Sequence, residues 1–263
     1  MAQFNPNDFS RFDNFDILTT TYKIVLGHDI ACHVLIPKSL VERAQDQDKS
    51  TGLQPIIFRI HGGGFVSGSS LFPDFFAPWH LELAFRNNAV IVSCDYRLAP
   101  EATIEDVDSF LKWIHTELPS FVSGRTNVQV DVTRIMMAGD SAGGYLSLLV
   151  GLNHSSELRA VSAAYPLNAK YAELFPLGRR DLYLLDKVED GARFPRGGVF
   201  VWHGKADTVV PVEGSLKLAE KLKELDTDLL LTLAVREGEH GFDATSSIDE
   251  QWMKDGLEGL VSV

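Results

Sequence analysis

An α/β architecture, with a mostly parallel central sheet and helices on both faces, is indicated by three features of this 263-residue sequence. Short apolar runs typical of strands alternate along the chain with longer segments of helical periodicity. Hydrophobic residues make up 45% of the chain and include 16 phenylalanines, enough for a large core. No repeat, low-complexity stretch or internal linker interrupts the pattern. We therefore expect a single domain spanning residues 1–263.

The expected elements follow one another in a regular order. A period-two strand occupies residues 22–36 and ends at Pro37, and a polar loop follows over residues 41–54. Beyond it, apolar runs predict strands at residues 55–60, 89–94, 134–138, 159–165, 198–203 and 229–235. Helical spacing predicts helices at residues 79–88, 103–117, 144–150 and 213–225.

Residues 1–20 precede the first expected strand and would form an N-terminal arm or lid. The arm carries four phenylalanines among asparagine and aspartate, at Phe4, Phe9, Phe12 and Phe15. Two interpretations stay open. The rings could dock onto the surface of the core, or they could serve as a lid or as half of a homodimer contact.

Charge and cysteine content exclude several classes of function. The net charge of −12 disfavours binding to nucleic acid or to an anionic membrane. Neither a secretory signal nor an apolar run near the length of a membrane span is apparent, so we expect a soluble cytoplasmic protein without membrane insertion. Cys32 and Cys94 are expected to be buried free thiols, although a disulfide is not excluded. No cysteine–histidine cluster has metal-ligand spacing, so neither a metal nor another cofactor is implied.

The G-D-S-A-G motif at residues 139–143 is the most informative part of the chain. It follows an apolar strand and precedes a helix, which places Ser141 at the apex of a sharp turn. Such a turn exposes the hydroxyl at the edge of a sheet, and its glycines allow strand and helix to approach closely. Ser141 is therefore a candidate nucleophile.

A glycine-rich loop, His61-Gly62-Gly63-Gly64, follows the strand at residues 55–60. Consecutive glycines leave backbone N–H groups accessible to a ligand. A phosphate-binding loop would require a different pattern, ending in Gly-Lys-Ser/Thr or opening a helix as G-x-G-x-x-G. We therefore expect Gly63 and Gly64, together with Ala142, to donate their N–H groups to an oxyanion.

The acid and the base of a triad are expected downstream, because enzymes with this serine turn carry the order serine, acid, histidine. Asp207 lies just past a strand end, where α/β sheets place their chemistry. His240 follows the last strand in a glycine-flanked loop. His203 is a competitor for the role of base, but it precedes the acid and would reverse the order. We expect Asp207 to orient His240, and His240 to take the proton of Ser141.

The glycine loop, the serine motif and the segment Asp95-Tyr96-Arg97-Leu98-Ala99-Pro100-Glu101 together resemble the hormone-sensitive-lipase family of α/β hydrolases, which contains esterases, arylacetamide deacetylases and some lipases. The resemblance runs from about Tyr22 to His240 and implies an α/β-hydrolase fold. It places Gly63, Gly64 and Ala142 at the oxyanion-hole positions and gives the Asp95 segment a bracing role. The segment at residues 71–79 also resembles hydrolases of fungal secondary-metabolite clusters.

The chain departs from this family in its cap, which is usually built from a long N-terminal region and an insertion. Here the arm is short, and the insertion at residues 166–196 is reduced, so we expect an open pocket or one that is closed by the arm or a partner chain. The expected activity is hydrolysis of small or medium apolar carboxylic esters through an acyl-enzyme on Ser141. Other activities stay open: a thioesterase that releases or trims a polyketide-type metabolite, a formamidase, a lyase or C–C hydrolase, and a non-catalytic ligand-binding protein.

Overall fold

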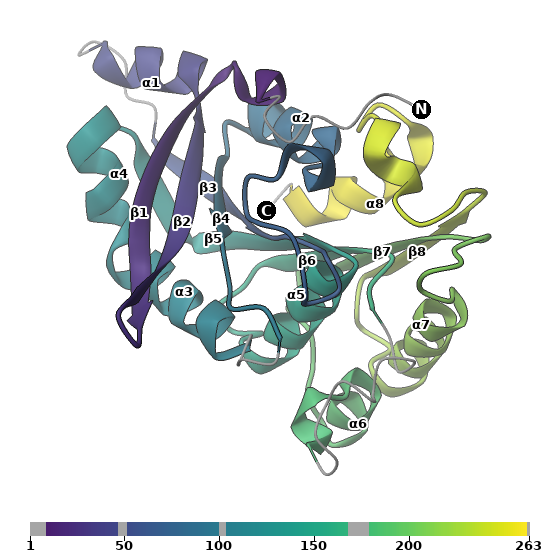
Figure 1. The fold of residues 1–263 in the computed structure, drawn as a ribbon. Helices are drawn as coiled ribbons and strands as arrows, with labels where there is room; N and C mark the ends of the chain where they lie inside the picture. Colours follow the sequence, from purple (N-terminus) through teal and green to yellow (C-terminus); the bar gives the residue numbers. More distant parts are fainter. Residues whose placement is uncertain (1–8, 47–51, 100–103, 168–178, 262–263) are drawn as a thin grey trace.

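The computed structural model describes residues 9–46, 52–99, 104–167 and 179–261, and within them eight strands form one twisted sheet (Figure 1). Its strand order is β1-β2-β4-β3-β5-β6-β7-β8. The pairs β1/β2 and β2/β4 are antiparallel, and every other neighbouring pair is parallel. The strands are β1 (Phe15–Val25), β2 (His28–Pro37), β3 (Leu53–Ile60), β4 (Val90–Cys94), β5 (Gln129–Asp140), β6 (Ala160–Ala164), β7 (Val199–Gly204) and β8 (Leu231–Arg236).

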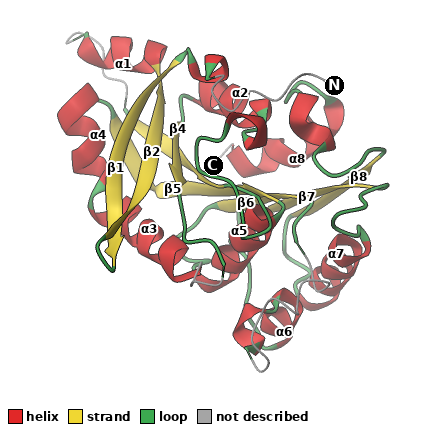
Figure 2. Ribbon diagram, viewed as in Figure 1, coloured by secondary structure: helices red, strands yellow, loops and turns green. Residues whose placement is uncertain are grey.

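Helices cover both faces of the sheet (Figure 2). The helices on one face are α1 (Lys38–Gln45), α3 (Ile104–Thr116), α4 (Leu118–Thr126), α5 (Ala142–Asn153), α6 (Leu184–Glu189) and α7 (Glu213–Leu225). The other face is covered by α2 (Pro78–Asn87) and α8 (Gln251–Val261), which lie on the same side in Figure 1. The α/β-hydrolase fold predicted from the sequence, with its mostly parallel sheet, is confirmed.

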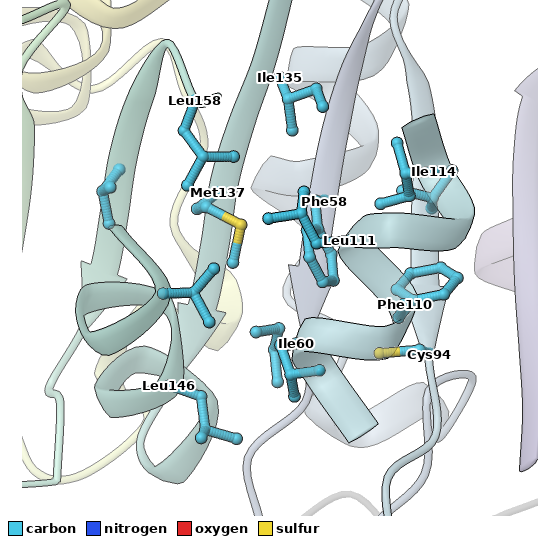
Figure 3. Close-up of a cluster of buried hydrophobic side chains, with 14 of the residues drawn as sticks. Phe58, Ile60, Cys94, Phe110, Leu111, Ile114, Ile135, Met137, Leu146 and Leu158 are labelled. Carbon is cyan, nitrogen blue, oxygen red and sulfur yellow. The ribbon is translucent and has the colours of Figure 1, made fainter. Parts of the chain in front are cut away.

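The parallel strands at the centre are buried on both faces, and their side chains alternate between two hydrophobic clusters. On the α3 and α5 side, Phe58 and Ile60 of β3 and Met137 of β5 pack near Phe110 of α3 (Figure 3). Ile57 and Met136, one residue away from these on the same strands, face the cluster under α2 and α8 instead. This two-sided burial explains why these strands read as continuous apolar runs.

The expected strand at residues 22–36 is wrong in its extent, because this part of the chain forms an antiparallel hairpin. Strand β1 begins at Phe15 and pairs with β2 across a two-residue turn. The turn residues Leu26 and Gly27 have φ angles of 51° and 81°, the positive values that a tight hairpin turn of this hand requires. The arm is correspondingly shorter than the twenty residues expected.

Four helices were missed in the sequence. Residues 41–54 were expected to be a polar loop, but α1 continues to Gln45 and buries only Leu40 and Val41. Helices α4 and α6 are also short, and α4 begins with a Leu-Pro pair that is compatible with a helix start. Helix α8 lies after the last expected strand and packs on the sheet through residues such as Trp252 and Met253. The three shorter helices, α1, α4 and α6, bury few residues and therefore give little periodic signal.

The described part of the N-terminal arm packs on the α2 side of the sheet. Phe12 and Phe15 are almost fully buried, whereas Phe9 is 46% exposed and Phe4 lies outside the described residues. The Phe12 ring meets the ring of Phe76 edge-on, with centroids 5.0 Å apart. Two of the four phenylalanines therefore dock onto the core, as one of the two sequence interpretations expects.

Replacing Phe12 with alanine is expected to lower the free energy of unfolding by about 3–5 kcal/mol, because it removes a buried ring and leaves a cavity. Urea denaturation followed by circular dichroism measures this change. The Phe9→Ala variant is the matched control and should change stability little, because Phe9 is half exposed. Equal effects of the two substitutions would contradict the docking of Phe12.

Candidate active site

Ser141 stands between the end of β5 and the start of α5, in a strained backbone conformation. Its φ and ψ angles are 55° and −117°, a region that residues other than glycine rarely adopt. The helix can start so close to the sheet because Gly143 has no side chain: a Cβ there would overlap the carbonyl oxygen of Ile60 at the end of β3. Such strain persists only where the surroundings impose it, and it clusters at functional sites.

Backbone hydrogen bonds hold this strained turn in place. The Ser141 N–H donates to the carbonyl of Ala164 at 2.9 Å, which ties the turn to the end of β6. The Ser141 carbonyl accepts from Tyr145 N–H, the first hydrogen bond of α5, and from Leu167 N–H, both at 3.0 Å. The serine is therefore anchored to both neighbouring elements, while its side chain borders a cavity.

The glycine loop turns sharply after β3. Gly63 and Gly64 have φ angles of 112° and 63°. The Gly63 carbonyl accepts the N–H groups of Val66 and Ser67, both at 3.1 Å, which closes the loop upon itself. Among the described residues, none accepts a hydrogen bond from the N–H groups of Gly63, Gly64 or Ala142. These donors are therefore available for a ligand.

Asp140, the residue before the serine, connects the two loops. Its carboxylate accepts the Gly62 N–H at 3.1 Å and lies 3.3 Å from the Arg59 guanidinium. Burial raises the pKa of Asp140 to about 6, although the arginine favours its ionised form. Asp140 lies within the serine motif, but the motif alone predicts no role for it. Its contacts arise because β3 and β5 are parallel neighbours, so that polar groups at the ends of the two strands meet.

His240 and Asp207 come together from separate loops. Asp207 Oδ2 lies 2.8 Å from His240 Nδ1. The other oxygen, Oδ1, accepts the N–H groups of Val209 at 2.9 Å and Val210 at 2.7 Å. The Asp207 side chain is completely buried, and 22% of the His240 side chain is exposed. The carboxylate is thus fixed by the backbone, and it orients an imidazole that reaches the surface of the cavity.

His203, the competing base, occupies a different environment. Its ring is fully buried; Nδ1 lies 2.8 Å from the Ser215 hydroxyl and Nε2 lies 2.8 Å from the Val210 carbonyl. Burial lowers the pKa of its imidazole, which favours the neutral form of the ring. Because both ring nitrogens are engaged, His203 has no free atom for a proton transfer. It packs beside Asp207, 3.3 Å from the carboxylate, as part of the wall that supports the acid.

A cavity of about 370 Å³ lies against Ser141 and His240. Gly63 and Gly64 also line it, so four of the six residues expected from the sequence border one space. The other two stand behind it: Asp207 contacts His240, and Ala142 is the buried first residue of α5. Apolar and acidic side chains complete the lining, namely Asp74, Phe75, Ala77, Asp140, Tyr165, Leu167, Val209, Asp243 and Ala244, together with the backbone of Gly241.

The segment expected to brace the site packs around the glycine loop. Asp95 accepts hydrogen bonds from the N–H and hydroxyl groups of Ser70, at 2.8 and 2.7 Å. The Tyr96 hydroxyl donates to the His61 carbonyl at 2.8 Å, and the two rings stack with centroids 4.2 Å apart. Arg97 pairs with the buried Asp106 of α3. Pro100 and Glu101 lie outside the described residues.

The expected cap insertion at residues 166–196 is described only in part, because residues 168–178 lie outside the described ranges. The remainder holds a 3-10 turn (Arg180–Leu182) followed by α6. The Tyr145 hydroxyl donates to the Leu182 carbonyl, which ties this part of the insertion to α5.

Replacing Gly63 with alanine is expected to lower kcat for an ester by about 100-fold, because displaced oxyanion donors cost that order of rate. An alanine Cβ would overlap the Ser67 carbonyl, and a φ of 112° is strained for any side chain. Steady-state kinetics on a chromogenic ester measures the effect. The control is Gly124→Ala on α4, where a Cβ meets no neighbouring atom and activity should be unchanged. A Gly63→Ala variant with normal kcat would contradict this role for the loop.

Comparison with known proteins agrees with this geometry. Residues 57–183 match a family model described as alpha/beta hydrolase fold. The chain is 26% identical to a probable carboxylesterase, M8, of a Phoma species over 95% of this chain and 97% of that protein. It is 30% identical over 140 residues to a non-reducing polyketide synthase, atr1, of Stereocaulon alpinum, covering 51% of this chain and 5% of that protein. Among solved structures, Thermogutta terrifontis esterase 2 phosphorylated by paraoxon superposes with a TM-score of 0.68 at 21% identity, over 94% of this chain and 92% of that one.

Proposed function

We propose that this chain belongs to the hormone-sensitive-lipase-like α/β hydrolases and that it is a serine hydrolase that cleaves carboxylic esters of small or medium apolar substrates. One observation carries the proposal. Ser141, His240 and the unpaired N–H groups of the glycine loop border the same cavity, and Asp207 holds the imidazole from behind. That combination supplies a nucleophile, a base, an orienting acid and oxyanion donors in one place.

The proposed reaction proceeds in two halves. The Asp207 carboxylate accepts a hydrogen bond from the Nδ1–H group of His240. This leaves Nε2 free to take the proton of the Ser141 hydroxyl as its oxygen attacks the ester carbonyl. The N–H groups of Gly63, Gly64 and Ala142 stabilise the resulting oxyanion. His240 then returns the proton to the departing alcohol. Water, activated by the same imidazole, hydrolyses the acyl-enzyme and releases the acid.

The substrate class follows from the walls of the cavity. No lysine or arginine is among the described residues that line it, whereas three aspartates are. An anionic substrate would therefore find no cation among these residues to pair with, and a neutral one with apolar groups beside Phe75, Leu167 and Val209 would be favoured. The volume of about 370 Å³ favours short and medium acyl chains over long ones.

A second candidate rests on the match to a polyketide synthase. The same machinery cleaves thioesters, so a thioesterase that releases or trims a polyketide-type metabolite is the alternative, within secondary metabolism. A formamidase would use the same residues with a smaller acyl group. Comparison of an acyl N-acetylcysteamine thioester with the matching oxygen ester distinguishes the first alternative, and N-formyl substrates test the second.

We also propose that the enzyme works in the cytoplasm. None of the helices in the described ranges has the length and apolar character needed to cross a membrane. Cys32 and Cys94 face each other across β2 and β4, and both are free thiols, which supports a reducing compartment such as the cytoplasm.

The exposed ring of Phe9 supports a homodimer contact at the arm. Mass photometry of wild type and Phe9→Ser tests the dimer.

The direct test combines active-site labelling with turnover. The protein is treated with a fluorophosphonate, its intact mass is measured, and p-nitrophenyl esters of increasing acyl length are assayed. A single adduct on Ser141 with turnover that peaks at short or medium chains is expected. An adduct without turnover of any simple ester would favour the thioesterase alternative. Absence of an adduct would overturn the serine mechanism and favour a ligand-binding protein.

A further inference from the structure

A charged side chain lies inside the protein, two residues before the glycine loop. Arg59 stands near the end of β3, and none of its surface is exposed. Ile57, on the same face of the strand, packs in the apolar cluster under α2 and α8. Because an unpaired buried charge costs much free energy, an arginine at such a position requires acceptors that the fold supplies. The proposed reaction assigns it no task.

The acceptors of Arg59 come from three separate segments around the site. One guanidinium nitrogen, Nη1, donates to the Ser70 carbonyl at 3.3 Å and to the Ser93 hydroxyl at 3.4 Å. The other, Nη2, donates to the Phe75 carbonyl and, at 3.3 Å, to Asp140 Oδ1. Phe75 lines the cavity, and Asp140 directly precedes the serine. One planar cation therefore ties the cavity wall to the serine turn.

Asp140 extends this link to the glycine loop. Its second oxygen, Oδ2, accepts the Gly62 N–H at 3.1 Å, and a Cβ at Gly62 would overlap it. The Gly62 carbonyl belongs to the same peptide group as the Gly63 N–H, and it lies 2.7 Å from His61 Nδ1. Gly62 is thus held at both its N–H and its carbonyl, and this fixes the direction of the Gly63 N–H.

The charge of Arg59 also keeps this carboxylate in its accepting form. Burial raises the pKa of Asp140 to about 6, and the nearby Asp243 raises it as well, whereas Arg59 lowers it. Loss of the arginine would raise the pKa further, so the carboxyl would carry a proton near neutral pH. A neutral carboxyl accepts a hydrogen bond more weakly than a carboxylate, so the contact with Gly62 depends on the arginine.

We propose that Arg59 is a positioning residue of the oxyanion hole, which acts through Asp140 on the glycine loop. Its forked guanidinium holds Asp140 against Gly62, so that the N–H groups of Gly63 and Gly64 are in place before the substrate binds. Such order matters because oxyanion donors are most effective when they already point to where charge will develop. This inference rests on the proposed function and adds to it a residue outside the motifs.

The test replaces the whole ion pair, because a single substitution would leave a buried charge without its partner. In Arg59→Met/Asp140→Leu both side chains become apolar at similar volume, so the fold should persist, as the unfolding midpoint measures. We expect kcat for a p-nitrophenyl ester to fall by about 10- to 100-fold while KM changes little, because the oxyanion forms only in the transition state. If the pair were merely structural, kcat would follow the stability of the fold instead.

A trifluoromethyl ketone measures the oxyanion site directly. The Ser141 oxygen adds to its carbonyl carbon, His240 takes the hydroxyl proton, and the ketone oxygen becomes an oxyanion. Its inhibition constant should rise in the double variant by the factor by which kcat falls. Ser93→Ala is the matched control, because it removes one hydrogen bond of Arg59 and leaves the one to Asp140. This control should lower the unfolding midpoint without changing kcat or the inhibition constant.

A folded double variant with the wild-type kcat and inhibition constant would overturn the inference, and the proposed esterase function would stand. Arg59→Lys keeps the inference testable if the double variant does not fold. Its ammonium is a point charge without the fork, so kcat should fall several-fold at unchanged KM, and wild-type values would again overturn the inference. A wild-type protein that neither cleaves an ester nor binds the ketone would instead remove both proposals.

Discussion

Substitution of Ser141 by alanine is expected to lower kcat for a p-nitrophenyl ester by about 10⁴- to 10⁶-fold, with the fold intact. The expected loss is large because the variant has no oxygen with which to form an acyl-enzyme. The backbone of the turn should persist, since it is held by hydrogen bonds from the Ser141 N–H and carbonyl groups rather than by the side chain. Circular dichroism and the midpoint of thermal unfolding test this persistence.

Ser147 provides the matched control for that experiment. It is a buried serine on the same helix, α5, and its hydroxyl has no partner among the described residues. Ser147→Ala should therefore retain activity and the fluorophosphonate adduct, whereas Ser141→Ala should lose both. A Ser141→Ala protein that still turns over the ester would assign the nucleophile elsewhere. Loss of the adduct in both variants would point to a general disturbance of α5.

Features encoded by local sequence were predictable. The central strands are buried on both faces, so β3, β4 and β5 appear in the sequence as apolar runs. The serine turn and the glycine loop depend on local backbone geometry, which glycine at fixed spacing indicates. The pairing of Asp207 with His240 was expected from their order and their positions after strands, and the structure places them 2.8 Å apart.

What escaped prediction depends on contacts between distant residues. The link from Asp140 to Gly62 requires β3 and β5 to be neighbours in a known register. The division of roles between His203 and His240 could be argued only from chain order, whereas the structure separates them by burial and by hydrogen bonds to Ser215 and Val210. The hairpin of β1 and β2 was missed because its turn contains Leu26, a residue that rarely adopts a positive φ.

Asp243 belongs to the same class of hidden features. Its position just after His240 is visible in the sequence, but aspartate in a polar loop is ordinarily a solvated charge. Only the fold reveals that it is fully buried in the wall of the cavity, where it accepts the indole N–H of Trp202. Substrate preference is encoded in the residues that line the cavity, whereas the motifs encode the reaction.

Replacing Asp207 with asparagine is expected to lower kcat by about 10⁴-fold with little loss of stability. The asparagine carbonyl oxygen can still accept the N–H groups of Val209 and Val210, so the side chain should keep its orientation. Its amide nitrogen then replaces the oxygen that faces His240 Nδ1. Because that nitrogen donates, Nδ1 must accept, and the ring proton moves to Nε2. An imidazole in this tautomer cannot take the proton of Ser141.

Asp226→Asn is the control, because it neutralises another buried aspartate. Asp226 lies 2.7 Å from Arg196, with which it forms an ion pair, and it does not line the cavity. That variant should change the unfolding midpoint without changing kcat, whereas Asp207→Asn should do the reverse. Fluorophosphonate labelling of Asp207→Asn should slow in parallel with kcat, since both reactions need the activated Ser141 hydroxyl. Near-normal kcat in Asp207→Asn would mean that another group orients His240. Slow turnover with normal labelling would instead place the defect after acylation, in the step where His240 activates water.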